Sequence, residues 1–421
     1  MRALKRRPLD DSRLKWWAGT AIGVALLALL IDQPLLLVLA LLLGLAAASA
    51  WCWWRFGLSE VSFERHLSAE RAAFGEEIEI ELAIENAKPL PLVWLDVQDE
   101  FPEELPVLGA TIEPNEKSRR VTFHTVFSAG PYERVRRRYR ISCAKRGLFS
   151  FGPATLQTGD PFGFSRRADL IPGSNRLIVY PEIKTLVEFG LPAELPLGER
   201  MPIRPLVEDP FSVEGIRPYL PGDHPRRIDW RASARTGEMQ TKRYERRASP
   251  SLAIFLDTNT FEHFWEGADS KLMEHAITVA ASVAVYGVDR GYQVGLTANA
   301  PTAGSAEIIR IPASAQAAQL PRLLEALALL VGGTGIRIEK VIGEESARIP
   351  WGMSVVVVTP NVTDGMQLEL ARLARRGHRP VLIACGDEPS LAPGLAGRVH
   401  AYHLPAGKEG SDGLAPVPLT G

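Results

Sequence analysis

The chain has 421 residues, which at roughly 150 residues per domain indicates two or three domains. Its hydrophobic fraction of 46% and charged fraction of 23% are ordinary for packed cores and exclude wholesale disorder. The formal net charge of −1 gives no overall attraction to nucleic acid. The three cysteines lie far apart in the sequence and form neither a disulfide framework nor a paired-cysteine metal motif.

Two uncharged apolar runs, residues 16–31 and 35–54, lie near the N-terminus. At 1.5 Å per residue the second helix would span about 30 Å, the thickness of a hydrocarbon core, and the first about 24 Å. Asp32, Gln33 and Pro34 separate them, and a proline does not continue a helix cheaply. The sequence therefore predicts a transmembrane helical hairpin within residues 1–58.

Basic residues predict the orientation of this hairpin. Six of them precede the first run and none lies in the turn: Arg2, Lys5, Arg6, Arg7, Arg13 and Lys15. The positive-inside rule then puts both soluble domains in the cytoplasm, anchored to the inner (plasma) membrane. The alternative is a cleaved signal peptide, because Ala48-Ser49-Ala50 resembles a cleavage site. Two apolar runs in place of one short one favour the hairpin.

Residues 59–183 change to a period of two. Apolar and acidic residues alternate over 77–85, as in a strand with one solvated face. Further strand-like runs, separated by Pro, Gly and Asn, cover residues 92–97, 120–127, 132–143 and 177–180. This pattern predicts an antiparallel β-sandwich of immunoglobulin-like type.

One strand of this domain is strongly basic. Arg134, Arg136, Arg138 and Arg140 share one face because side chains alternate along a strand. They could pair with the glutamates of 77–85 across the sheet, or they could lie against anionic lipid headgroups.

A proline-rich connector is expected over 184–248, and it contains the densest motif of the chain, residues 211–237. Pro221-Gly222-Asp223 is a turn signal. Five charged residues of the motif could interlock through bidentate guanidinium–carboxylate bonds: Arg217, Asp223, Arg226, Asp229 and Arg235.

This motif resembles the signature of a widespread bacterial family of membrane-anchored proteins of unassigned function. The matching residues are Arg217, Tyr219, Pro221, Gly222, Asp223, Arg226, Asp229, Trp230, Ala234, Arg235 and Thr236. The resemblance implies a membrane anchor, a sandwich and a von Willebrand factor A-like domain in this order. It also implies a MoxR-type AAA+ ATPase as partner, because genes of the two families are often neighbours.

Three interpretations of the motif remain open. It could be an ion-pair collar that locks the connector onto the next domain. It could be a docking surface for a protein, with Trp230, Tyr219 and the arginines as anchors. A phosphate or nucleic-acid site is the third, and the interspersed acids disfavour it.

Residues 249–405 alternate strand and helix and predict a doubly wound α/β sheet, followed by a flexible tail over 406–421. Buried strands are expected at 252–256, 354–359 and 380–384, and helices at 269–288 and 366–376. Ser314 is expected to cap a helix that runs through Leu330.

Ligands of such sheets bind at the carboxyl ends of the strands, where Asp257 follows the first one. By resemblance to von Willebrand A domains, Asp257, Asn259 and Thr334 occupy metal-site positions. Phe261 and Pro360 stand where that site needs side-chain oxygens, so the Mg²⁺ site is degenerate. Alternatively, Asp257 and Thr334 satisfy only backbone amides.

The sequence contains no phosphate-binding loop, nucleophile elbow or zinc-protease motif. We therefore expect no catalytic or cofactor-binding residues and no nucleic-acid partner. The expected function is a non-enzymatic, membrane-anchored adaptor that binds a protein, by family resemblance a MoxR-like ATPase. The alternative is a module that binds anionic lipid or another polyanion at the membrane surface.

Overall fold

The computed structural model divides into two units, Met1–Glu182 and Ile183–Gly421, and each is considered by itself. It describes residues 5–7, 12–31, 33–108, 112–115, 120–161, 166–173, 175–197, 213–244, 250–262, 266–303, 305, 307–332, 336–350, 352–386, 392, 395 and 397–406.

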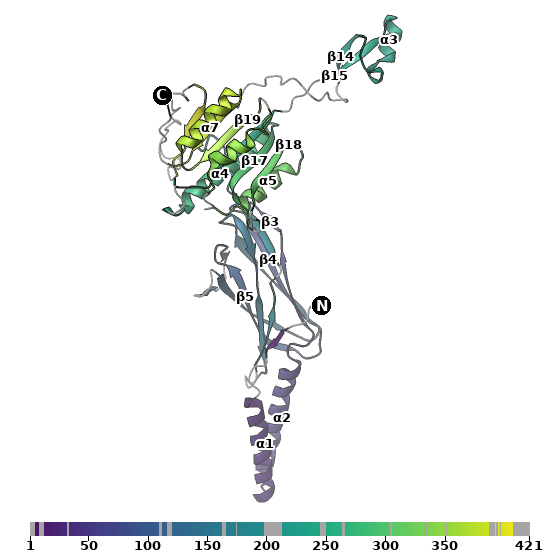
Figure 1. Ribbon diagram of the computed structural model, residues 1–421. Coiled ribbons are helices and arrows are strands. Elements are labelled where there is room, and N and C mark those ends of the chain that lie inside the picture. The colour runs from purple at the N-terminus through teal and green to yellow at the C-terminus, as the bar shows by residue number, and fades with distance from the viewer. Residues whose placement is uncertain are drawn as a thin grey trace. The chain divides into compact units, whose positions relative to one another are not determined.

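Two consecutive helices lie near the start of the first unit, α1 (Ser12–Ile31) and α2 (Pro34–Phe56), and they contact each other (Figure 1). Both extend a few residues beyond the predicted runs. Pro34 takes the first turn of α2, where its missing N–H costs nothing. Among the described helices, α2 is long and apolar enough to cross a membrane, with a mean hydropathy of 2.4. The apolar part of α1, Gly19–Ile31, is shorter.

The helix pair is attached to the β-domain at both ends. The short strand β1 (Lys5–Arg7) precedes α1 and pairs with β12 (Arg166–Ile171), and β2 (Val61–Leu67) follows α2. At the end of α2, the Arg167 guanidinium donates to the Arg55 carbonyl at 3.2 Å, and the Trp53 indole donates to the Pro91 carbonyl at 3.2 Å. The bond from Arg167 satisfies a carbonyl that the end of α2 leaves without a partner inside the helix. Together the two bonds hold the end of α2 against the β-domain.

The β-domain is a sandwich, as predicted. Its other strands are β3 (Arg71–Ala72), β4 (Glu77–Asn86), β5 (Leu92–Pro102), β6 (Val107–Leu108), β7 (Ile112–Asn115), β8 (Arg120–Ala129), β9 (Arg134–Ser142), β10 (Gly147–Ser150), β11 (Ala154–Gly159) and β13 (Arg176–Val179). They form sheets of order β1-β12-β11-β5-β8-β7, β2-β4-β9-β6 and β10-β13-β3. Ile80 and Leu82 from one large sheet share a buried core with Val97, Phe101 and Phe123 from the other. The alternation of apolar residues along β4 and β5 therefore builds two inward faces.

The basic strand β9 pairs with the acidic strand β4, which confirms the first of the two interpretations of its arginines. In the register Arg138 lies opposite Glu81, and its Nε donates to the Glu81 carboxylate at 2.9 Å. Arg134 lies opposite Glu85 and also pairs with Glu64 at 2.9 Å. Cross-strand glutamates therefore supply counter-charges to this face.

A buried ion pair connects the two large sheets of the sandwich. Arg65, on the core-facing side of β2, donates from Nε and Nη2 to the two oxygens of Asp99 on β5, at 2.8 and 2.5 Å. The Asp99 side chain is fully buried and that of Arg65 is 5% exposed. Arg65 also donates to Asn175 Oδ1 at 3.2 Å. A bidentate pair of this kind stabilises the fold only while both partners are present.

Removing one partner should therefore leave a buried charge without compensation. We expect Asp99→Ala to lower the free energy of unfolding of the sandwich by about 3–5 kcal/mol. Glu85→Ala, which removes an exposed partner of Arg134, should have a much smaller effect. Urea unfolding of the full chain in detergent, with hydrogen exchange in sandwich peptides as the readout, measures both. Equal effects of the two substitutions would contradict the structural role of the pair.

The second unit contains a mixed sheet of order β18-β17-β16-β19-β20-β21. Its elements are β16 (Ser251–Leu256), α4 (Ser270–Asp289), β17 (Gln293–Pro301), β18 (Ile308–Ser314), α5 (Gln319–Ala328), α6 (Ile338–Glu345), β19 (Ser354–Thr359), α7 (Asp364–Arg375), β20 (Arg379–Ala384) and β21 (His400–His403). Strand β18 is antiparallel to β17, and the other neighbours are parallel.

Helices cover both faces of this sheet (Figure 1), so the prediction of a doubly wound α/β domain is confirmed. On one face α6 and α7 pack over a core that contains Phe255, Val355 and Val357. On the other, α4 lies so close that a Cβ at Gly287 would be 2.8 Å from both Leu252 and Val294. The absence of a side chain at this glycine therefore permits the close helix–sheet contact.

The start of α5 and the contacts of residues 184–197 were not predicted. The expected cap Ser314 ends β18, and α5 begins only at Gln319, so the prediction of a helix from Ser314 was wrong. Residues 184–197, assigned to the connector, contact α4 and the residue that follows it: the Lys184 amide donates to Ser282 Oγ at 3.0 Å, and Arg290, directly after α4, pairs with Glu194 at 2.7 Å.

Candidate functional site

The carboxyl ends of three adjacent strands bring polar side chains together. Asp257 directly follows β16, Asn299 lies near the end of β17, and Thr359 is the last residue of β19. All three side chains are buried, and Asp257 is only 3% exposed. The parallel order β17-β16-β19 places them at one edge of the sheet, as the position of Asp257 predicted.

Both oxygens of Asp257 accept hydrogen bonds from the protein. Its Oδ1 accepts from the Asn259 amide at 3.0 Å and from Asn299 Nδ2 at 2.6 Å. Its Oδ2 accepts from Thr359 Oγ1 at 2.9 Å. Burial raises the pKa of Asp257 to about 6 although these hydrogen bonds oppose the rise, and the charge of Glu339 adds to it.

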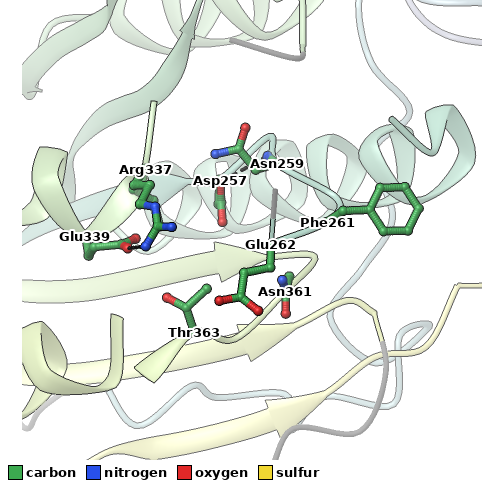
Figure 2. Close-up of a pocket in the computed structure, with 9 residues that line it drawn as sticks. Asp257, Asn259, Phe261, Glu262, Arg337, Glu339, Asn361 and Thr363 are labelled. Carbon is green, nitrogen blue, oxygen red and sulfur yellow. Dashed lines mark hydrogen bonds and ion pairs between the residues drawn. The ribbon is translucent and has the colours of Figure 1, made fainter. Parts of the chain in front are cut away.

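A pocket opens beside this network. Figure 2 shows Arg337 and Glu339 on one side of it and Glu262 and Asn361 on the other, with the Phe261 ring directed outward. Ile338 and Thr363 complete the lining, together with Asp257 and Asn259. Arg337 and Glu339 form an ion pair at 3.6 Å. The pocket therefore combines carboxylates with one cation and an exposed aromatic ring at its rim.

The predicted metal-site residues have different outcomes. Asp257 and Asn259 both line the pocket, and Asn259 Nδ2 donates to the Ile336 carbonyl at 2.8 Å. Thr334 lies outside the described residues. Within the described part of the chain, no three His, Cys, Asp or Glu side chains are grouped so that they could hold a metal ion. The degenerate Mg²⁺ site stays a prediction.

Sequence reasoning missed Asn299 and Thr359 as partners of Asp257. Asn299 is a fully buried polar residue of β17, and it donates to Asp257 and to the Ile336 carbonyl. An amide inside an otherwise buried strand was the available signal, because a buried polar side chain requires partners.

The motif residues form a small module over 213–244. Strands β14 (Val213–Pro218) and β15 (Gln240–Tyr244) pair antiparallel, and a 3-10 turn (Pro225–Arg227) and helix α3 (Trp230–Thr236) lie between them (Figure 1). Arg217 makes the expected bidentate bond with Asp223, at 2.7 and 2.6 Å. Asp223 also accepts from the Leu220 amide at 2.9 Å, which closes the predicted turn.

The remaining motif residues form the helix and its surface. Asp229 caps α3 by accepting from the Arg231 and Ala232 amides, and Tyr219 donates its hydroxyl to the Asp223 carbonyl at 3.4 Å. Gly237 ends α3 in the left-handed conformation, with φ of 75°. Trp230 is 69% exposed. Arg226 and Arg235 form no ion pair with any carboxylate of the described residues, so only part of the expected ion-pair set is present.

Comparison with known proteins places these features in a wider group. The model of a family described as "Protein of unknown function DUF58" matches residues 215–391. Over its C-terminal part, this chain is similar to the DUF58 family. The matched range contains the motif module and most of the α/β domain, the pocket residues included. Nothing in this match concerns a MoxR-type partner.

One curated relative and several solved structures are also similar. The "Uncharacterized protein YeaD" of Bacillus subtilis (strain 168) is 21% identical over 249 residues, 57% of this chain and 56% of that protein. The match thus spans little more than half of the relative's length. A CARDB domain of the PF1109 protein from Pyrococcus furiosus is 12% identical and covers 28% of this chain and 91% of its own, with a TM-score of 0.18. A cohesin module from Clostridium perfringens is 12% identical over 28% of this chain and 95% of its own, with a TM-score of 0.19.

The raised pKa of Asp257 makes the stability of the α/β domain depend on pH. Because the folded-state pKa of about 6 lies above the ordinary 3.8, protonation favours the folded state. The stability that this group contributes is complete below about pH 4 and is lost as the pH rises through about 6.

We expect Asp257→Asn to remove this dependence. The amide oxygen can keep both donors at Oδ1, and the amide N–H can donate to Thr359, whose hydroxyl can turn to the Asn361 carbonyl 2.6 Å away. Relative to the variant, the wild type should lose up to about 3 kcal/mol between pH 4 and 7. Urea unfolding of both proteins across this range measures the difference. Asp364→Asn, at an exposed carboxylate, is the control. If the difference in unfolding free energy between wild type and Asp257→Asn does not change with pH, the raised pKa of Asp257 is refuted.

Proposed function

We propose that the protein is a membrane-anchored, non-enzymatic adaptor whose α/β domain, of von Willebrand factor A-like type, binds a protein at the carboxyl edge of its sheet. The observation that carries the proposal is the Asp257 network. Its carboxylate is 3% exposed and accepts three hydrogen bonds from its own chain. A carboxylate held in this way positions the loops of the edge, and the loops present the surface.

The surface around the pocket has the composition of a protein-binding site. Phe261 is 42% exposed, Val331 50% and Ile336 37%. The Val331 amide donates to the Pro301 carbonyl at the end of β17, and the Ile336 carbonyl accepts from Asn259. These apolar side chains therefore belong to the same edge as the charged pocket. Apolar anchors beside charged groups are typical of a specific interface.

The membrane anchor would be the pair α1 and α2, which crosses as a hairpin. The attachment of both ends of the pair to the β-domain supports this topology. Strand β1 precedes α1 and β2 follows α2, and both belong to the sandwich. Two spans would return the chain to its starting side, and the basic residues before α1 favour the cytoplasm for that side.

This topology predicts the behaviour of C-terminal fusions in bacterial cells. A fused fluorescent protein that matures only in the cytoplasm should fluoresce, and a fused alkaline phosphatase, which needs an oxidising compartment, should stay inactive. Moving the phosphatase to the turn between α1 and α2 should activate it. Phosphatase activity at the C-terminus would show a single span or a cleaved signal peptide instead.

The partner that the family resemblance implies is a MoxR-like AAA+ ATPase, which would supply the nucleotide chemistry. An adaptor and an ATPase would then divide the work, with recognition on one chain and turnover on the other. The exposed edge of the α/β domain is the surface that we assign to this contact.

A pull-down from neutral detergent tests the assignment. The full-length chain should retain the purified ATPase more strongly with ATP than without it. Phe261→Ala should weaken retention roughly thirtyfold, since truncation of an aromatic anchor that becomes buried in an interface typically costs about 2 kcal/mol or more. Leu368→Ala, at an apolar residue on α7 that is 51% exposed, is the matched control. If retention of the ATPase depends neither on ATP nor on Phe261, the assignment of the contact to this edge is wrong.

The alternative function, binding of anionic lipid or a polyanion, first concerned the arginines of β9. Glu64, Glu81 and Glu85 provide counter-charges to that face, which favours the adaptor. Flotation with anionic and neutral vesicles separates the two proposals, because only the alternative expects a preference for anionic vesicles.

A further inference from the structure

The module of residues 213–244 has almost no core of its own. Within residues 215–242, whose side chains the structure describes, Thr241 is the one buried residue. Four large apolar side chains are more than half exposed: Ile216, Leu220, Trp230 and Met239. Units below about 40 residues usually need a disulfide, a metal or a partner surface to be stable. The module therefore has apolar area available for a contact.

Its two central carboxylates are used for internal structure. The bidentate bond from Arg217 holds the pKa of Asp223 at about 2, and the Leu220 amide contributes to the same effect. Asp229 accepts from the Ala232 and Arg231 amides, which lowers its pKa as well. The charges of Lys242 and Arg235 also contribute to lowering the pKa of Asp229, but the hydrogen bonds of both carboxylates go to Arg217 and to groups other than the guanidinium groups of Arg226, Arg231 and Arg235.

Those arginines lie together on the outer side of α3. At 3.6 residues per turn, Trp230, Arg231, Ala234 and Arg235 fall within one half of the helix circumference. All four are exposed, whereas Ser233, on the opposite side, donates to the Asp229 carbonyl and accepts from the Gln240 amide. Arg226 is exposed in the turn just before the helix. The outer side of α3 thus presents an aromatic ring beside guanidinium groups.

We propose that this side of the module is a second docking surface, which takes an acidic protein segment that also carries apolar side chains. This inference deepens the proposed adaptor function and rests on it, because it names the chemistry of a protein partner. Guanidinium groups bind carboxylates in a planar, bidentate geometry, and Trp and Arg are the residue types that dominate protein interfaces.

The composition favours a protein over a nucleic acid or a membrane. A duplex or a lipid surface requires an extended array of cations, because each phosphate contact adds a similar increment. Here three exposed arginines lie within five residues of one exposed tryptophan in the sequence, and Ile216, Leu220 and Met239 add apolar contact area. A short acidic and apolar segment satisfies both parts of this surface.

The test uses the full-length chain in neutral-lipid nanodiscs and a short synthetic peptide of alternating Glu and Leu pairs. The peptide should bind with an affinity that falls as salt is raised, and its Gln-for-Glu counterpart should not bind. The double substitution Arg231→Glu with Arg235→Glu should weaken binding roughly tenfold or more, and so should Trp230→Ala. Arg322→Glu, an exposed charge reversal on α5, is the matched control and should leave binding unchanged.

Two results would overturn the proposal. One is equal peptide binding by wild type and the double variant, with hydrogen exchange over 213–244 showing that the variant keeps its fold. The other is that the wild type binds phosphatidylglycerol vesicles but not the peptide, and that the double variant no longer binds the vesicles. Failure of the ATPase pull-down with intact peptide binding would refute only the proposed ATPase contact. A successful ATPase pull-down without peptide binding would refute only this second surface.

Discussion

A carboxylate buried at the end of a central strand requires donors, and this requirement shapes the carboxyl edge of the sheet in the α/β domain. Asp257 obtains them from its own loop, from β17 through Asn299 and from β19 through Thr359. Asn299 and Asn259 in turn donate to the Ile336 carbonyl, so the segment before α6 is held by the same network. The hydrogen bonds of this one network therefore hold four segments around the pocket: the loop after β16, the ends of β17 and β19, and the segment before α6. The positions of the exposed side chains on these segments depend on the same network.

The two units use charge in different ways. In the sandwich a buried pair, Arg65 with Asp99, joins the two sheets, and exposed pairs such as Arg138 with Glu81 neutralise an outer face. In the motif module the pair of Arg217 and Asp223 shapes a turn, and the arginines near Trp230 are left at the surface. The pairs Arg65–Asp99 and Arg217–Asp223 support structure, and the exposed arginines near Trp230 are those to which we assign the second docking surface.

Much of the architecture could be predicted because it follows from local periodicity. The alternation along β4 and the continuous apolar run of β19 gave strands within a residue of those observed, and Asp257 was placed at the correct edge. Pairings between distant residues could not be predicted in this way. Arg65 contacts Asp99 on the opposite sheet of the sandwich, and Asn299 contacts Asp257 at the end of the neighbouring strand; both contacts depend on the tertiary arrangement of the strands. Ser314 shows the converse, because strand pairing with β17 overrode a local capping signal.

The central claim is that the carboxyl edge of the α/β sheet recognises a protein. Hydrogen exchange of the full-length chain in nanodiscs, with and without the ATPase and ATP, measures this most directly. The account predicts slower exchange over residues 257–262 and 336–342 in the complex, with β8 and β9 of the sandwich unchanged. Protection confined to the sandwich, or turnover of a substrate by the isolated chain, would contradict it.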